Sequence, residues 1–192
     1  MKRSLSSMLL LAVATWAFSV SSAQAADPAS SSDPLKEISW ISQKFIVLFF
    51  VLHDCPICNQ YVPEMNRIVQ DYRSRGFAFI AVYPESDFSK EDAQKHAREY
   101  QFNFPFVIDP GLGLAAKIGI KVAPEVAVLN SKRELLYRGR IDDHYAEVDK
   151  ERPAVVRHDL RQALDDIAVG IKPQRAQTPA VGCPINYEQP GS

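Results

Sequence analysis

The feature that most constrains the fold is a run of eight consecutive apolar residues, FIVLFFVL, from Phe45 to Leu52. The run is rich in β-branched and aromatic residues and is bounded by His53 and Asp54, so it predicts a strand that is covered on both faces. Strands of this kind lie inside sheets that carry helices on both sides. We therefore expect an α/β protein in which residues 45–52 form a central parallel strand.

The residues that follow predict a βαβ unit. Apolar side chains recur every three or four residues, at Ile57, Tyr61, Met65, Ile68 and Tyr72. This spacing is typical of one face of a helix, and the helix is expected to stop at Gly76. A second apolar run, FAFIAVY at 77–83, predicts the next strand. A parallel pair of strands needs a crossover connection, which the helix supplies.

The remaining elements are expected to be shorter. Ser89 and Asp92 resemble the start of a helix, and Pro153 suits the first turn of another that ends near Gly170. Between them we expect a strand at 104–108, a turn at 109–111, a short helix at 112–118 and a hairpin formed by 125–129 and 134–137. Together these elements predict a single α/β domain with a central mixed sheet flanked by helices.

The ends of the chain predict an exported protein. Two basic residues precede the apolar stretch 8–20, and small residues ending at Ala25 follow it, so residues 1–25 are expected to be a cleaved signal peptide. Residues 26–34, ADPASSSDP, predict a flexible leader, residues 35–170 the domain, and residues 171–192 an extended C-terminal tail. We expect a periplasmic or otherwise exported location, where disulfides form and persist.

Length and charge exclude several classes of protein. The chain has 192 residues, which suits one domain, and its 22 Lys and Arg against 23 Asp and Glu give a formal net charge of -1. This balance argues against binding to nucleic acid. After signal cleavage no apolar run is long enough to span a membrane. We expect no cofactor and no resident metal.

The predicted strand-to-helix junction carries two cysteines, in the sequence Cys55-Pro56-Ile57-Cys58. Residues three positions apart share one helix face, and the free N–H groups of the first turn favour a thiolate at Cys55. Cys55 is therefore the candidate nucleophile and Cys58 the candidate resolving thiol. A structural bridge or half of a zinc site are the alternatives. Neither a second CxxC nor a close histidine pair supports zinc, and a bridge over three residues would constrain the unfolded chain little.

With these features the segment from about Leu35 to Val169 resembles the thioredoxin superfamily. Pro63 lies eight residues beyond Cys55, where thioredoxins have a helix-kinking proline, and Ala123-Pro124 is similar to the cis-proline loop that faces the cysteines and pairs with substrate backbone. The long segment before Pro124 is similar to the redoxin branch, which groups thiol-specific antioxidants (AhpC/TSA-like) with exported TlpA-like thioredoxins. The resemblance implies a thiol-disulfide oxidoreductase that acts on protein thiols and disulfides.

Departures from the family patterns bear on the mechanism. A thiol peroxidase of the peroxiredoxin type is an alternative, but Leu48 and Leu52 stand where such enzymes have Pro and Thr, and the predicted strand has no hydroxyl. Asp54 replaces the usual Trp, and its charge would raise the pKa of the thiol. The buried acid of thioredoxins is missing from the strand. Glu125, after Pro124, is a possible proton acceptor if it points inward, or else a solvated carboxylate at a strand edge.

A second alternative is a Sco-like Cu(I) chaperone. Soft thiolates bind Cu(I), so Cys55 and Cys58 with His53 or His144 form a possible ligand set. The Sco pattern is a CxxxC motif with a histidine near the position of the proline loop. This chain has CxxC and Ala123-Pro124 instead.

Two further segments are similar to features of exported bacterial redoxin-domain proteins, namely residues 140–143 (RIDD) and 182–185 (GCPI). Cys183 in the second is the odd cysteine of an exported chain, and the flanking Gly182 and Pro184 favour a turn. We hypothesise that Cys183 folds back to form a disulfide with Cys55 or Cys58 and so serves as an additional resolving thiol.

Overall fold

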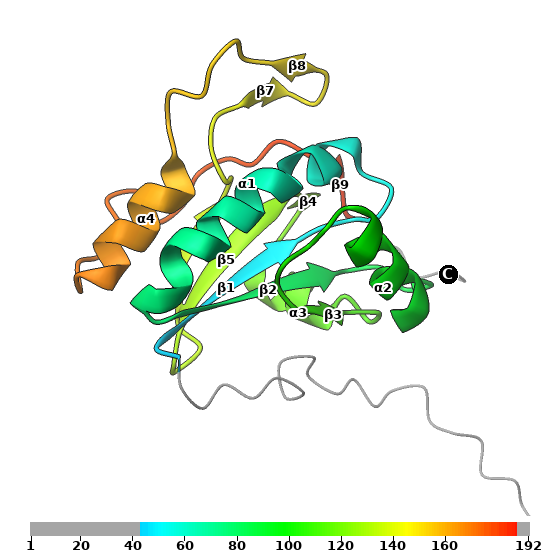
Figure 1. Cartoon of the computed structure of the whole chain (residues 1–192), viewed down its shortest axis with the longest axis horizontal. Helices are drawn as coiled ribbons and strands as arrows, with labels where there is room; N and C mark the ends of the chain where they lie inside the picture. Colours follow the sequence, from blue (N-terminus) through cyan, green and yellow to red (C-terminus); the bar gives the residue numbers. More distant parts are fainter. Residues whose placement is uncertain (1–42, 188–192) are drawn as a thin grey trace, which may run out of the picture. The chain divides into compact units, whose positions relative to one another are not determined.

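A five-stranded mixed sheet forms the centre of the computed structural model, which describes residues 43–187 (Figure 1). The strand order is β3-β2-β1-β5-β6. The strands are β1 (Phe45–Phe50), β2 (Phe77–Tyr83), β3 (Phe106–Ile108), β5 (Glu125–Asn130) and β6 (Leu135–Gly139). β1, β2 and β3 are parallel, whereas β5 runs antiparallel to both β1 and β6. The predicted signal peptide and leader lie outside the described residues.

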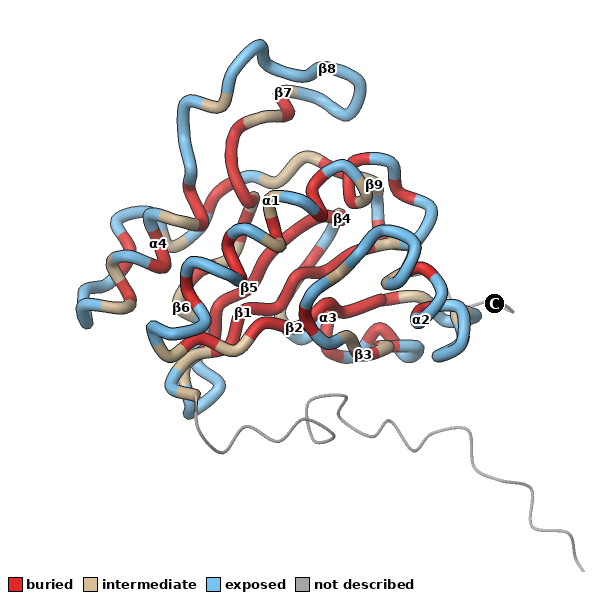
Figure 2. Tube along the Cα trace, in the orientation of Figure 1, coloured by how far each residue is buried: buried red, intermediate tan, exposed pale blue. Residues whose placement is uncertain are grey.

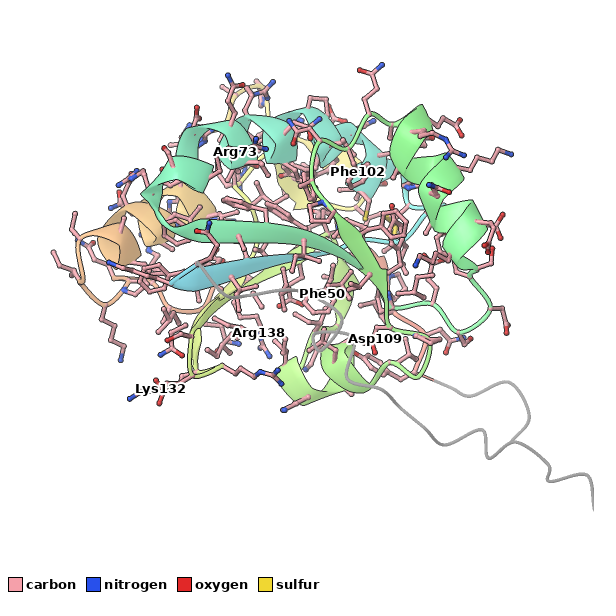
Figure 3. The ribbon with its side chains drawn as sticks, turned by 60° about the horizontal axis from the view of Figure 1, so that its bottom comes forward. Phe50, Arg73, Phe102, Asp109, Lys132 and Arg138 are labelled. Carbon is pink, nitrogen blue, oxygen red and sulfur yellow. A yellow bond between two sulfur atoms is a disulfide. The ribbon has the colours of Figure 1, made fainter. Side chains whose placement is uncertain are left out.

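Helices cover both faces of this sheet. They are α1 (Pro56–Tyr72), α2 (Lys90–Glu99), α3 (Gly113–Ile118) and α4 (Asp159–Ala168), with a 3-10 turn, η2, at Arg73–Arg75. α1, α2 and α4 lie on one face and α3 on the other (Figures 1 and 3). Two small sheets complete the fold: β4 (Val122–Ala123) with β9 (Cys183–Pro184), and β7 (Tyr145–Glu147) with β8 (Lys150–Glu151). Among residues 43–187 no helix is long and apolar enough to cross a membrane.

The central strand separates two hydrophobic cores because its successive side chains point to opposite faces. Val47, Phe49 and Val51 belong to the core under α1 and α4, whereas Ile46, Leu48 and Phe50 pack towards α3. All six are buried, and Figure 2 shows burial running along the middle strands. The expected double-sided strand and the α/β class are thus confirmed.

Several elements begin or end away from their predicted positions. β1 stops at Phe50 because the chain then enters the loop before the cysteines. α4 starts at Asp159 rather than 153, since the carboxylate of Asp143 accepts hydrogen bonds from the N–H groups of Val156 and Arg157 and holds them outside the helix. The helix start at Ser89 is confirmed, because its hydroxyl accepts a hydrogen bond of 3.1 Å from the N–H of Asp92.

The described part of the tail, residues 171–187, is packed along the domain. The N–H of Thr178 donates to the carbonyl of Arg138 over 3.0 Å, and its hydroxyl lies 2.8 Å from that of Tyr137. Gly139 permits this approach, because a Cβ there would lie 2.1 Å from the Thr178 hydroxyl oxygen. Ile185 is only 6% exposed and packs in the core near α3. This part of the tail has little regular structure, and the sequence did not predict that it packs against the domain.

Candidate active site

The two cysteines of the CxxC motif stand at the start of α1, directly beyond the central strand. Cys55 is the N-cap residue and Pro56 occupies the first turn, where its missing N–H costs no hydrogen bond. The N–H of Cys55 donates to the carbonyl of Leu52 over 3.3 Å, and its own carbonyl accepts from the N–H of Asn59. Pro63 lies inside α1, as the resemblance implied.

Cys55 is joined by a disulfide to Cys183, which lies 128 residues further along the chain. The two Cα atoms are 6.0 Å apart. This is one of the two bonds that the sequence hypothesis allowed for Cys183. Cys58 therefore remains a free thiol, and it is 0% exposed. The structure thus brings all three cysteines of the chain to the beginning of α1.

The proline loop lies against the disulfide. The Ala123-Pro124 peptide bond is cis, as the resemblance implied. The sulfur of Cys55 is 3.3 Å from the carbonyl oxygen of Ala123. Ala123 is also the residue that pairs with Cys183 across β4 and β9. The loop is consequently in contact with both ends of the disulfide.

The environment of Cys58 keeps its thiol protonated. The pKa of Cys58 is raised to about 12, chiefly by burial and in smaller part by the negative charges of Glu85 and Asp54. A backbone hydrogen bond at Leu52 acts in the opposite direction. Burial outweighs it, because desolvation penalises the thiolate and not the thiol. At neutral pH this thiol must lose a proton before it can attack a disulfide.

Glu85 is a site residue that the sequence reasoning missed. It follows β2, whose carboxyl end lies beside that of β1 because the two strands are parallel. One carboxylate oxygen is 2.5 Å from Nδ1 of His53, and the other accepts from the His53 N–H over 3.1 Å. Burial raises the pKa of Glu85, although these two interactions with His53 lower it. The adjacency of two parallel strand ends is the signal that would have found it.

The same acid belongs to a cluster that bears on the Cu(I) alternative. Among residues 43–187 the candidate metal-ligand group comprises His53, Asp54 and Glu85, whose ligand atoms lie within 4.8 Å of one another. Neither Cys55 nor Cys58 belongs to this group. Nε2 of His144 lies 3.6 Å from a carboxylate oxygen of Glu151 instead. The ligand set of the Cu(I) alternative, two cysteines with a histidine, is therefore not the group found here.

Glu125 is buried, but it is not directed to the cysteines. Along β5 it alternates with Val126 and shares the side of Ala127, which packs towards α3. Its carboxylate accepts from the N–H of Lys121 over 3.0 Å and lies 3.4 Å from Nε of Arg138. Figure 3 shows Arg138 on the α3 side of the sheet. The hypothesis that Glu125 accepts the proton of Cys58 is thus not supported, because the sheet lies between them.

Comparison with known proteins agrees with this geometry. A family model described as Redoxin matches residues 22–152. The chain belongs to the Redoxin family. This Redoxin protein is also 28% identical, over 100 residues, to the thiol-disulfide oxidoreductase ResA of Halalkalibacterium halodurans. The match covers 52% of this chain and 56% of the relative, so the chain spans about half the length of the curated protein it matches.

Solved structures share the fold at lower identity. An uncharacterized conserved protein from Geobacillus kaustophilus is 24% identical with a TM-score of 0.68, over 78% of this chain and 80% of that one. A hypothetical protein from Sinorhizobium meliloti 1021 is 23% identical with a TM-score of 0.68, over 81% and 85%. A putative thioredoxin from Neisseria meningitidis is 21% identical with a TM-score of 0.50, over 68% and 77%. The expected thioredoxin-like fold is confirmed.

Residues 140–143 of the Redoxin protein form hydrogen bonds to α1 and to the first residue of α4. Nε of Arg140 donates to Asp159 over 2.6 Å, at the first residue of α4. Asp142 accepts from the hydroxyl of Tyr61 on α1, and burial together with this carboxylate raises the pKa of Tyr61. Asp143 holds the chain before α4, as described above. The contacts of these residues therefore link the 140–143 segment to α1 and to the start of α4.

Proposed function

We propose that this Redoxin protein is an exported thiol-disulfide oxidoreductase that exchanges disulfides with cysteines of other proteins through Cys55 and Cys58. The observation that carries the proposal is the disulfide of Cys55 to a distant cysteine, with the free thiol of Cys58 one turn deeper in α1. The similarity to a thiol-disulfide oxidoreductase supports it. Export rests on the predicted signal peptide, and N-terminal sequencing of protein isolated from cells should find Ala26 as the first residue.

The exchange proceeds in two balanced steps. The thiolate of Cys55 attacks a partner disulfide, which forms a mixed disulfide and releases one partner thiolate. The thiolate of Cys58 then attacks the Cys55 sulfur, which forms the Cys55-Cys58 disulfide and releases the second partner thiolate. Two electrons pass from the protein to the partner, and the reverse sequence oxidises a partner dithiol. The N-terminus of α1 stabilises the Cys55 thiolate that both directions require.

Glu85 is the residue we assign as proton acceptor for Cys58. Glu85 follows β2, whose carboxyl end lies beside the end of β1 that leads to the cysteines, and its negative charge raises the pKa of Cys58. The raised pKa of Glu85 itself makes the carboxylate a stronger base than an exposed glutamate. Residues Ala123 and Pro124 are assigned to the partner's backbone, because they border the Cys55 sulfur.

Equilibration of purified protein in glutathione redox buffers, followed by non-reducing peptide mapping, tests this function. We expect a Cys55-Cys58 disulfide whose fraction follows the buffer potential. Cys55→Ser should abolish exchange with a disulfide-bonded protein substrate, whereas Cys58→Ser should accumulate mixed disulfides with it. Exchange should persist with all metal chelated. Equal trapping by both variants, or no exchange by the unaltered protein, would overturn the proposal.

A further inference from the structure

The tail occupies the whole backbone edge that leads into the proline loop. Val122 pairs with Pro184 and Ala123 with Cys183 in the antiparallel ladder of β4 and β9. On the preceding residues, the carbonyl of Lys121 accepts from the N–H of Ile185 over 3.0 Å, and that of Ile120 accepts from the hydroxyl of Tyr187. Figure 1 shows β9 beside β4 near the beginning of α1. An edge paired in this way is closed to any other extended segment.

One position of the tail fits this edge only as glycine. A Cβ at Gly182 would lie 2.1 Å from the carbonyl oxygen of Ala123 and 3.0 Å from the nitrogen of Pro124. Both are backbone atoms, which have no rotamer to move into. The restriction comes from close approach, since Gly182 has no left-handed backbone conformation. The backbone of the proline loop therefore leaves room only for glycine directly before Cys183.

The position of Cys183 is the one that the exchange reaction requires of a partner cysteine. It is carried by an extended segment paired to β4, and its sulfur is bonded to the candidate nucleophile Cys55. The free thiol of Cys58 lies in the same core cluster, as a resolving thiol must. The disulfide therefore has the composition of a mixed disulfide in which the partner is the protein's own tail.

We propose that residues 181–187 are a tethered substrate mimic, and that the partner proteins present an extended segment with glycine directly before the reactive cysteine. This inference rests on the proposed function and adds the partner class to it. The tail and the partner compete for the same edge of β4. Cys183 is then an internal substrate cysteine rather than a second resolving thiol.

The mimic gives a defined order of steps. The Cys58 thiolate attacks the Cys55 sulfur, the Cys55-Cys58 bond forms, and Cys183 leaves as a thiolate that takes up a proton. This exchange transfers no net electrons. With its covalent link broken, the tail leaves β4 and a partner segment pairs there. The partner thiolate attacks Cys55 and displaces Cys58, and a second partner thiol resolves the mixed disulfide, which oxidises the partner and reduces the protein by two electrons.

A pair of glycine variants tests whether the tail must fit this edge. The proteins are equilibrated in a glutathione redox buffer, and their disulfides are mapped. In Gly182→Ala the ratio of Cys55-Cys183 to Cys55-Cys58 disulfide should fall roughly tenfold, because overpacking against backbone undocks the tail. Gly113→Ala is the matched control, because a Cβ at that position would meet no heavy atom within 4 Å, and its ratio should be unchanged. An unchanged ratio in Gly182→Ala would overturn the mimic.

Peptides test the partner class directly, in a Cys58→Ser, Cys183→Ser protein whose only thiol is Cys55. The probes are the peptide PAVGCPINY, residues 179–187, and its counterpart with alanine before the cysteine, each joined to glutathione in a mixed disulfide, so that attack of Cys55 on the peptide sulfur releases glutathione thiolate. The glycine peptide should react with Cys55 roughly tenfold faster, and glutathione disulfide provides a probe that needs no docking. Reaction with glutathione disulfide but equal rates for both peptides would overturn the mimic alone. Failure of Cys55 to react with any probe would overturn the proposed function as well.

Discussion

Cys58 is fully buried, whereas the reaction proposed for it needs its thiolate. Below a pKa of about 12 the thiolate fraction grows about tenfold per pH unit. Conversion of the Cys55-Cys183 disulfide to Cys55-Cys58 should therefore accelerate steadily as pH rises from about 6 to about 9, with a slope approaching one logarithmic unit per pH unit. Acid quenching followed by peptide mapping measures the rate. A rate that does not change with pH would show that Cys58 is not the attacking group.

Replacement of Glu85 separates its charge from its proposed role as a base. Glu85→Gln removes a negative charge that raises the pKa of Cys58, so that pKa should fall, as ultraviolet thiolate absorbance will show. Conversion to Cys55-Cys58 at neutral pH should nevertheless slow, because the proton acceptor is lost. Asp54→Asn, at an exposed position, is the matched control and should lower the pKa without slowing the reaction. Faster conversion in Glu85→Gln would leave Glu85 only an electrostatic influence.

For individual residues, the sequence predicts positions that are fixed by the residues next to them in the chain. The CxxC pattern predicted that Cys55 and Cys58 lie at the start of a helix, and the resemblance predicted the cis bond before Pro124; the structure confirms both positions. Glu85 was missed and the direction of Glu125 was left open, because the sheet order and the strand face decide on which side of the sheet each carboxylate lies.

His96 on α2 joins three elements through its ring. Nδ1 lies 2.9 Å from the hydroxyl of Tyr83 on β2, and Nε2 lies 3.0 Å from Oδ1 of Asn59 on α1. The amide oxygen is an acceptor only, so Nε2 carries the proton and Nδ1 accepts from the tyrosine. The neutral ring therefore satisfies both partners. Burial accordingly lowers the pKa of His96 below its ordinary value of 6.5.

This histidine should make the stability of the domain depend on pH. A depressed folded-state pKa stabilises the fold above the ordinary value of 6.5, and that stabilisation is lost as pH falls further, since the unfolded chain binds the proton more readily. His96→Gln should cost about 1–2 kcal/mol of unfolding free energy at neutral pH and flatten the decline between about pH 7 and pH 5. Urea unfolding measures both. His158→Gln, an exposed histidine, should retain the decline, and an equally steep decline in His96→Gln would contradict the assignment.

Elements with local determinants were predicted well. β2 has its predicted bounds, and the Ser89 cap and the periodicity of α1 are local signals. The start of α4 was misplaced, because Pro153 is a good first-turn residue locally, whereas Asp143 from a distant loop competes for the backbone groups at 156 and 157. The edge pairing of β4 with β9 has no local pattern at all.

The Cys55-Cys183 disulfide closes most of the domain into one loop of 128 residues, whereas Cys55-Cys58 closes almost none. A cross-link over a long loop restricts the unfolded chain more. Under oxidising conditions Cys183→Ser should therefore lower the free energy of unfolding by about 2–4 kcal/mol. Under reducing conditions the two proteins should unfold at nearly the same denaturant concentration. Equal stability in both conditions would mean that the long-range disulfide does not persist in solution.

Across the whole molecule, the sequence predicted the class and the order of most elements, because alternating strands and helices leave few topologies. The path of residues 171–187 was not predicted. Its contacts are made by isolated residues, such as Thr178 against Gly139 and Ile185 against Lys121, and each depends on a surface assembled from elsewhere in the chain.

The complete burial of Cys58 has a consequence for chemical durability. Of the three cysteines in the sequence, all within the described residues, two are bonded to each other and the third is 0% exposed, so this form presents no accessible free thiol. Alkylating reagents, peroxides and stray metal ions react with accessible thiolates, and the oxidation of cysteine beyond a disulfide begins from such a thiolate. This form therefore protects the cysteines from such modification, and in the proposed mechanism the sulfur of Cys55 becomes available only when the tail is released.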